Sequence, residues 1–392
     1  MSVKDFPVAT PATGADTLTF GVEEEFFLVD LRTGRAPGRV PKTFVKTCQR
    51  RLGQAVTFEL QQSQVELVSP VFDDAVRALE TLTALRAQMS EIARAMHLGI
   101  IASGSHPLAR WQQQLHTDKP HYKRLADAYQ MIGLREFFCG LHIHVGVHGA
   151  DRVQLMNRMM PWLPLFLALS TSSPFWNLRR TGMYSYRQSA YTEWPRTGIP
   201  DFFADEADYH RFIDILKRAG SIRDGGELWW TLRPSPRHPT LELRIADSCT
   251  RAADTIALAT LFRCLVSAHL RLPELGSERS SATRRLIEEN RWRAERYGIE
   301  AEFIDEQRER TVPVAERVEE ALRLIEPDAR VLDPHGTLRA LRTILARGTS
   351  AHAQLQVYEE ALAVGASHRD ALRAVVDWLL RNTMPEQKIQ LA

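Results

Sequence analysis

Three consecutive glutamates occupy positions 23–25, inside the segment GVEEEFFLVD (21–30), which has the apolar character of a strand. Side chains alternate between the two faces of a strand, so Glu23 and Glu25 point the same way, with their Cα atoms roughly 7 Å apart. Two carboxylates at that spacing repel each other by roughly 2–3 kcal/mol at an effective dielectric constant near 20. The segment is therefore either a solvent-facing edge with three charges or one wall of a metal-binding face.

Three other strand-like regions place acidic or imidazole side chains where alternation puts them on one face. These residues are Glu59 and Glu66 of a predicted hairpin, His142 and His144 of CGLHIHVGV, and Glu242 with Arg244 of TLELRIAD. Each has an ordinary explanation when taken singly: a solvated carboxylate, a hydrogen-bonded histidine pair, or an ion pair worth under ~1 kcal/mol. If the strands share a sheet, however, so many carboxylates need divalent cations, and oxygen-rich ligation favours Mg²⁺ or Mn²⁺ over zinc.

Hard cations held by glutamates, with arginines nearby, are suited to phosphoryl transfer from a nucleotide. The chain contains no GxxxxGK[ST] and no GxGxxG segment, which argues against a P-loop or Rossmann site. Any ATP would have to be held on the face of the sheet by metal ions and arginines. Alternation also turns Glu24 to the opposite face, where it needs a partner of its own, such as an arginine behind the sheet.

The bulk composition excludes several other classes of protein. The 392 residues are 44% hydrophobic and 25% charged, as in an ordinary globular protein, and a net charge of +2 gives no general attraction to nucleic acid or anionic membranes. Four cysteines without a CxxC pair argue for a reducing compartment and against zinc or disulfides. Residues 1–16 are expected to be a flexible tail without a signal peptide, and the longest apolar stretch is too short to span a membrane. We expect a cytoplasmic protein without nucleic-acid or membrane partners.

The elements that must position these residues follow from hydrophobic periodicity. Strands are expected at 18–30, 56–60, 64–70, 100–102, 137–147, 227–234 and 240–247. Helices are expected at 41–52, from an N-cap at Asp73 to a stop near Gly99, at 151–170, at 349–364, and from a cap near Ser367 to just before Pro385.

Two longer regions complete this prediction. Residues 177–200 form a long polar segment, and its aromatic residues favour a functional loop over disorder: Tyr184, Tyr186, Tyr191 and Trp194. From residue 251 onward the pattern is nearly pure helix. We therefore predict an α+β fold with one catalytic domain over 17–392, rich in sheet at 17–250 and helical at 251–392.

Six separate motifs resemble those of the carboxylate–amine ligases, also called type 2 glutamate–cysteine ligases. They are TLTFGVEEEFFLVD, QVELVSPV, SGSHPLARW, CGLHIHVGV, MYSYRQSAYTEWPRTG and WWTLRPSP…TLELRIADS, and they occur in the same order and spacing from about residue 17 onward. The resemblance implies a glutamine synthetase-like fold, in which a curved antiparallel sheet forms the active-site floor and helices pack behind it. A homodimer is compatible with it.

The resemblance also implies ATP-dependent amide formation through an acyl phosphate, with glutamate and cysteine as the expected substrates. Carried over residue by residue, the metal ligands for two or three Mg²⁺ ions would be Glu23, Glu25, Glu59, Glu66, His142 and Glu242. The residues that neutralise phosphates or a substrate carboxylate would be Arg187, Arg233 and Arg244, and the pocket would be lined by His144 and Trp229. Two other functions stay open: a metal-dependent amidohydrolase of γ-glutamyl amides, and a catalytically silent binding protein on the same scaffold.

Overall fold

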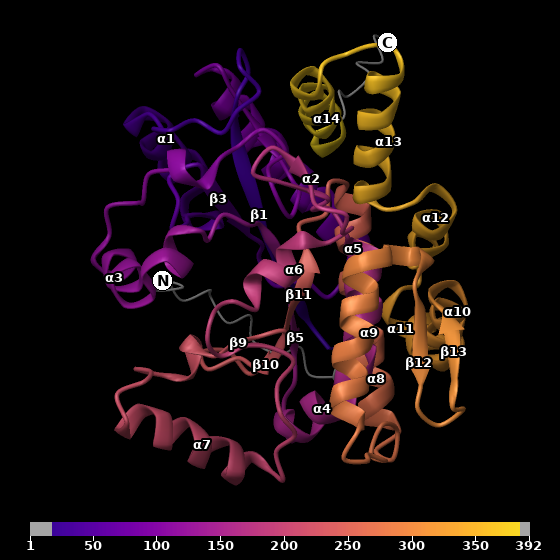
Figure 1. Ribbon diagram of the computed structural model, residues 1–392. Helices are drawn as coiled ribbons and strands as arrows, with labels where there is room; N and C mark the ends of the chain where they lie inside the picture. Colours follow the sequence, from indigo (N-terminus) through magenta and orange to yellow (C-terminus); the bar gives the residue numbers. More distant parts are fainter. Residues whose placement is uncertain (1–17, 385–392) are drawn as a thin grey trace.

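A seven-stranded antiparallel sheet lies at the centre of the molecule, in a computed structural model that describes residues 18–384 (Figure 1). The expected tail at 1–16 lies outside the described residues. The strand order is β10-β11-β5-β1-β3-β2, and β4 also pairs with β1. These strands are β1 Phe20–Asp30, β2 Val56–Phe58, β3 Gln64–Val68, β4 Leu98–Ile101, β5 Gly140–Gly146, β10 Leu232–Pro234 and β11 Thr240–Asp247.

β1 is the strand around which this sheet is built, because it pairs with three others. Its first half pairs with β5, its middle with β3, and its last residues with β4. The strands predicted to share a sheet with it are therefore its neighbours. The apolar residues that alternate with the polar ones on β5, namely Leu141, Ile143 and Val145, are fully buried in the main hydrophobic core.

The helices that the structure describes are α1 Lys42–Leu52, α2 Ala75–Arg94, α3 Pro120–Leu134, α4 Arg152–Met159, α5 Leu163–Ser170, α6 Tyr186–Tyr191, α7 Glu206–Arg218, α8 Ala252–Arg271, α9 Thr283–Tyr297, α10 Val314–Leu324, α11 Glu326–Leu332, α12 Arg339–Arg347, α13 Ser350–Ala363 and α14 His368–Thr383. Of these, α2, α4, α5 and α8 cover the face of the sheet that carries this core, whereas α13 and α14 pack with Phe27 and Val29 on the other face. α8 is long and apolar enough to span a membrane by length and composition alone, but 83% of its apolar stretch is buried inside the fold, as in the core helix of a globular protein.

The partner of Glu24 is an arginine behind the sheet, as predicted. Arg86 of α2 donates from Nε to Oε2 of Glu24 at 3.0 Å and from Nη2 to Oε1 at 2.5 Å, and both side chains are only 1% exposed. Thr255 of α8 donates a further hydrogen bond of 2.7 Å to Oε1. β1 is thus fixed from behind by α2 and α8, with Glu23 and Glu25 on its other face.

The long helix α2 differs in both its ends from the prediction. Its N-cap is Asp74, which accepts a hydrogen bond from the backbone of Arg77, so the prediction of Asp73 was wrong by one residue. Gly99 is not a helix stop but a residue of β4. A Cβ atom there would lie 2.5 Å from Cδ2 of Leu380 in α14, so this glycine permits the close approach of the last helix.

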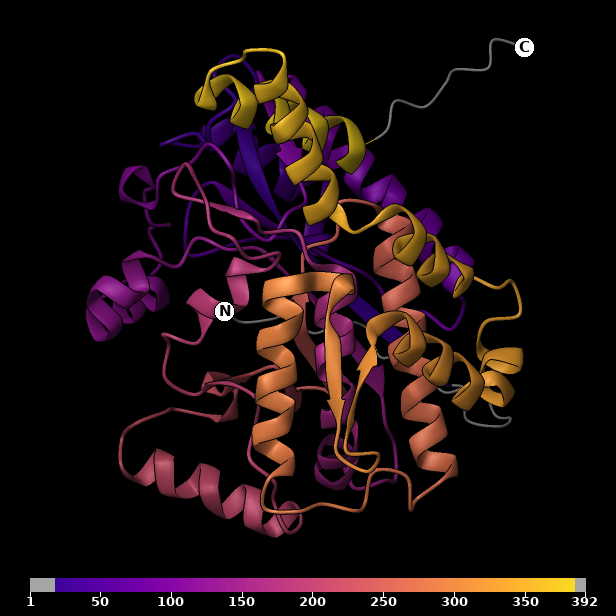
Figure 2. The ribbon, with the colours of Figure 1, turned by 45° about the vertical axis from the view of Figure 1, so that its right-hand side comes forward.

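The helical C-terminal third is confirmed, but it contains a hairpin that the pattern did not predict. β12 Glu302–Asp305 and β13 Arg310–Pro313 pair outside the helices, and Figure 2 shows this hairpin beside α9. Strands this short and partly exposed leave little periodicity to detect. Residues 177–200 likewise contain short elements, namely β7 Arg179–Arg180, α6 and β8 Thr197–Gly198. β7 pairs with β6 Phe175–Trp176, and β8 pairs with β9 Trp229–Trp230.

Candidate active site

A single pocket on the sheet face opposite the Glu24–Arg86 pair collects every residue that the sequence singled out for function. Its lining includes Glu23, Glu25, Glu59, Glu66, His142, His144, Arg187, Trp229, Arg233, Glu242 and Arg244. These residues come from β1, the β2–β3 hairpin, β5, α6 and the β9–β11 region. The polar residues on alternating positions of separate strands therefore face one space.

Strand register explains why they meet. Glu23 of β1 lies opposite His142 of β5, and Glu242 of β11 lies opposite His144 of the same strand. Glu25 lies opposite Glu66 of β3. Two carboxylates directly opposite each other in an antiparallel pair repel, so this pair destabilises the sheet unless a cation lies between them.

Two groups of side chains could each hold a metal ion, and both contain Glu23. One group is Glu23, His144 and Glu242, and the other is Glu23, Glu66 and His142; within each, the ligand atoms lie within 4.8 Å of one another. Nδ1 of His142 is 3.0 Å from Glu23 Oε2, and Nε2 of His144 is 3.4 Å from Glu23 Oε1. His144, predicted as a pocket-lining residue, therefore also has the position of a ligand.

In the acidic half of the pocket, buried carboxylates repel one another when no cation is bound. Burial raises the pKa of Glu59 to about 7, and the negative charge of Glu25 adds to that rise. Burial and the charges of Glu23, Glu59 and Glu25 raise the pKa of Glu66 well above its usual value. For Glu23, interactions with His142 and His144 outweigh the effect of burial and hold its pKa well below normal. A divalent cation would remove this conflict because it lets all these carboxylates ionise together.

Glu59 lies at the edge of the hairpin and not in its ladder. β2 ends at Phe58, and the residue opposite Glu66 is Thr57, whose hydroxyl donates a hydrogen bond of 2.7 Å to Glu66 Oε2. Glu59 is the first residue after β2, and its backbone N–H donates a hydrogen bond of 3.4 Å to the carbonyl of Gln64. It still lines the pocket, but from the turn.

The other half of the pocket is cationic. Arg233 donates from Nε to Oε2 of Glu242 at 2.8 Å, and Arg244 donates to Oε1 of the same carboxylate. Burial alone would raise the pKa of Glu242, but the two guanidinium groups and His144 hold it far below its usual range. Two arginines share one carboxylate, which leaves positive charge for an anionic substrate.

Arg187 has a structural task besides its place in the pocket. An irregular register between Leu243 and Ala246 leaves carbonyl groups of β11 without partners on β5. The guanidinium group of Arg187 donates to the carbonyls of Arg244, Ile245 and Ala246 at 3.4, 3.4 and 3.1 Å. Arg187 thus supports the strand segment that carries Arg244.

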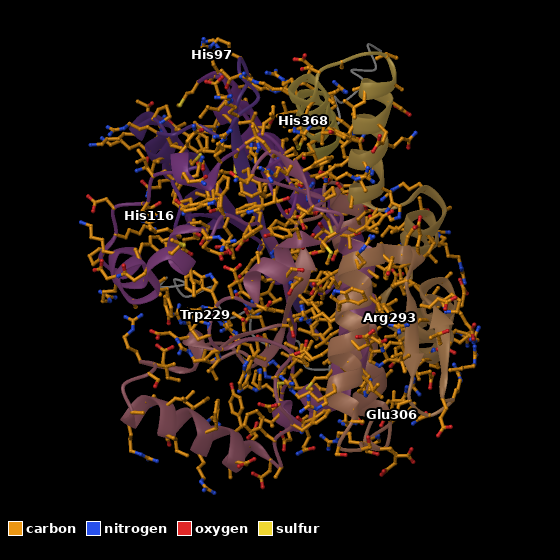
Figure 3. All side chains as sticks on the ribbon, in the orientation of Figure 1. His97, His116, Trp229, Arg293, Glu306 and His368 are labelled. Atoms are coloured by element: carbon orange, nitrogen blue, oxygen red, sulfur yellow. The ribbon has the colours of Figure 1, made fainter. Side chains whose placement is uncertain are left out.

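Several lining residues were not predicted from the sequence. The acidic end also contains Gln64, Tyr122 and Glu136, and the cationic end Arg223, Arg237 and His238. Glu136, Arg223, Arg237 and His238 have a weak signal in the sequence because they lie between helices and strands, where no periodicity marks a face. Gln64 is the first residue of β3, and Tyr122 lies in α3. Of the four aromatic residues noted in 177–200, Tyr191 and Trp194 line the pocket. Trp229, labelled in Figure 3, lies with its ring 5.5 Å from that of Trp194.

Comparison with known proteins identifies the family of this chain. A model of the family described as glutamate–cysteine ligase family 2 matches residues 19–377, nearly the whole described chain. The chain belongs to glutamate–cysteine ligase family 2. Among curated relatives, a protein of Ectopseudomonas mendocina named "Putative glutamate--cysteine ligase 2" is 44% identical over 95% of this chain and 99% of its own length. A protein of the same name from Rhodospirillum rubrum is 43% identical over 93% of this chain and 95% of its own.

Solved structures confirm the fold. The glutamate–cysteine ligase of Francisella tularensis, in complex with AMP, has a TM-score of 0.66 at 12% identity and covers 95% of this chain and 90% of its own. A bifunctional glutathione synthetase from Pasteurella multocida has a TM-score of 0.69 at 13% identity and covers 94% of this chain and 53% of its own. The glutamine synthetase-like fold inferred from the motifs is thus confirmed, and family membership makes the chain an ATP-dependent ligase of the carboxylate–amine type.

Proposed function

We propose that the chain joins the side-chain carboxylate of glutamate to the amine of cysteine, with ATP as energy source and Mg²⁺ as the required ion. The observation that carries this proposal is the pocket itself, in which carboxylates and imidazoles adjoin paired arginines on one face of a sheet. Mn²⁺ could replace Mg²⁺, because both prefer oxygen-rich sites.

The donor set fits hard divalent cations. Carboxylate oxygens dominate both candidate groups, and raised pKa values at Glu59 and Glu66 are what a cation would relieve. Glu23, Glu66 and His142 would hold one ion, and Glu23, His144 and Glu242 a second. Glu25 and Glu59 border the first group and could join it. Such ions supply the positive charge that a polyphosphate needs when a second anion approaches it.

The arginines do the corresponding work on the other side of the pocket. An oxygen of the glutamate side chain forms a bond to the γ-phosphorus of ATP, and ADP leaves. The amine nitrogen then bonds to the acyl carbon, the C–O bond to phosphate breaks, and a proton is lost from nitrogen. Arg233 and Arg244 are positioned to bind the negative charge that accumulates in both steps, because they already converge on Glu242.

The test is ADP release measured with each substrate omitted in turn. We expect release to depend on ATP, Mg²⁺, glutamate and cysteine together, with γ-glutamylcysteine as the product by mass spectrometry. Phosphate release that needs neither amino acid would contradict the proposal. Cleavage of a γ-glutamyl amide in nucleotide-free buffer would instead favour the amidohydrolase.

A further inference from the structure

Glu136 is a carboxyl group of the pocket that neither candidate metal group includes. Glu136 lies between α3 and β5 and lines the acidic end of the pocket. Its backbone is fixed, because its carbonyl accepts a hydrogen bond of 3.1 Å from Gln61 Nε2. Its side chain accepts a hydrogen bond from Trp194, a neutral donor. Among the described side chains no lysine, arginine or histidine forms an ion pair with Glu136. The glutamates of the two candidate metal groups each have such a neighbour or a hydroxyl group: Glu23 has His142, Glu242 has Arg233, and Glu66 has the hydroxyl of Thr57.

The surroundings of Glu136 favour a cation beside its carboxyl group. Burial raises its pKa to about 8; Arg187 opposes that rise, and the negative charge of Glu25 adds to it. Arg187 forms no ion pair with Glu136: its guanidinium group donates to backbone carbonyls of β11, and its ion-pair partner among the described residues is Asp247, at 3.8 Å. A buried carboxyl group in this position gains the most from a ligand that brings its own positive charge.

The neighbouring residues favour an organic ammonium over a metal ion. A divalent cation requires several oxygen ligands around it, whereas Phe138 and Trp194 line a small adjoining cavity together with Glu136, and Tyr191 lines the main pocket with it. Carboxylate and aromatic rings together match a primary ammonium, which donates a charge-assisted hydrogen bond to the carboxylate and is attracted electrostatically to the faces of the rings.

We propose that Glu136, framed by Trp194 and Tyr191, binds the ammonium group of the amine acceptor and thereby selects acceptors that carry a primary amine charged at neutral pH. This inference rests on the proposed function and names the part of the pocket that the acceptor occupies. The two ends of the pocket then bind different groups: the arginine end binds the anionic groups of the substrates, and the Glu136 end binds the ammonium group of the acceptor.

The test compares Glu136→Gln with a matched control, Glu193→Gln. Glu193 lies one residue from Trp194 but is 39% exposed and ion-paired with Arg135 at 3.0 Å, outside the pocket lining. In Glu136→Gln we expect the KM for L-cysteine to rise by ~10-fold or more, as for a lost charge-assisted hydrogen bond, with the KM values for L-glutamate and ATP unchanged. Glu136→Asp, which keeps the charge, should retain more cysteine affinity. The control should match the wild-type enzyme.

Hydroxylamine separates this inference from the proposed function, because it is a nucleophile without a positive charge at neutral pH. Wild type and Glu136→Gln should form glutamyl hydroxamate from glutamate, ATP and hydroxylamine at similar rates. If both enzymes form the hydroxamate and the KM for cysteine is unchanged in Glu136→Gln, the role of Glu136 is overturned while the proposed function stands. A rise shared equally by all three KM values would overturn it too, since that is the signature of a structural residue. No hydroxamate from the wild-type enzyme would refute the proposed function.

Discussion

The buried pair behind β1 is the most sharply testable feature of the fold. Arg86→Met removes the guanidinium group but keeps most of the apolar stem of the side chain. Glu24 would then remain in a site where it is 1% exposed, and the carbonyl groups of Thr250 and Cys249 would lose donors at 2.9 and 3.0 Å. Among the side chains of residues 18–384, Thr255 would then be the one donor left to Glu24.

The expected cost follows from breaking a buried ion pair on one side only. Removal of a single partner typically costs ~3–5 kcal/mol, because the other charge stays buried and uncompensated. The two carbonyl groups add to this loss, while water that enters the space left by the guanidinium offsets part of it. We therefore expect Arg86→Met to lower the free energy of unfolding by about 4 kcal/mol.

The assay is urea unfolding followed by circular dichroism, with the free energy extrapolated linearly to water. The double variant Glu24→Gln/Arg86→Met is the control, since it removes both charges and should be less destabilised than Arg86→Met alone. This coupling is the signature of a direct interaction. A loss below ~1 kcal/mol for Arg86→Met, or a double variant whose loss equals the sum of the two single losses, would refute the reasoning.

Three further predictions concern the pocket. Glu23→Gln should abolish the rise in melting temperature that Mg²⁺ produces, because both candidate metal groups share this residue, whereas Glu193→Gln should keep it. In the metal-free protein the pKa of Glu59 is raised, so between pH ~4.5 and ~7 the folded state binds more protons than the unfolded state. The free energy of unfolding of the wild type should therefore fall relative to that of Glu59→Gln as pH rises through this window, by at most about 3 kcal/mol. Urea unfolding at both ends of the window measures this difference, and a relative gain in stability of the wild type would contradict the prediction. Gly140→Ala would place a Cβ atom 2.3 Å from Nη2 of Arg187, so it should reduce kcat/KM for ligation. This loss should be non-additive with the loss caused by Arg187→Lys, whereas additive losses would show that the two positions are not energetically coupled.

Much of the site could be predicted because strand alternation is a strict rule. Residues two apart on a strand share a face, so Glu23 with Glu25 and His142 with His144 could be assigned together from the sequence alone. The same rule required a separate partner for Glu24, and Arg86 fills that role. The rule does not say which strands are neighbours. That step came from the resemblance of the motifs, and the register of β1 with β3 and β5 agrees with it.

Residues outside regular strands could not be predicted in this way. Glu136 lies on a connection between α3 and β5, and its position in the pocket depends on tertiary contacts with Gln61 and Trp194 that are far away in the sequence. Gly99 looked like a helix stop because glycine often ends helices. Its actual role, to let Leu380 approach β4, depends on a helix that comes almost 300 residues later.

The irregular register in β11 shows how a single residue redirects the polar face of the pocket. Glu242 lies opposite His144 and Leu243 opposite Ile143, but Ala246 lies opposite Leu141, so β11 advances three residues while β5 advances two. Strict alternation would turn Asp247 toward the core with Leu243. The extra residue instead brings Asp247 opposite Gly140, where its carboxylate accepts hydrogen bonds from the hydroxyl groups of Ser173 and Ser185 at 2.7 and 2.9 Å.

This β-bulge also exposes the carbonyl groups that hold Arg187, and Gly140 leaves the space that its guanidinium group fills. Bulge, glycine and arginine therefore depend on one another, because a regular ladder would pair the carbonyls of β11 with β5 and take these acceptors from Arg187. The sequence TLELRIAD reads as an uninterrupted strand, and nothing in its alternation marks the extra residue. The catalytic face is thus set by strand periodicity up to Leu243, and beyond it by one local departure from that periodicity.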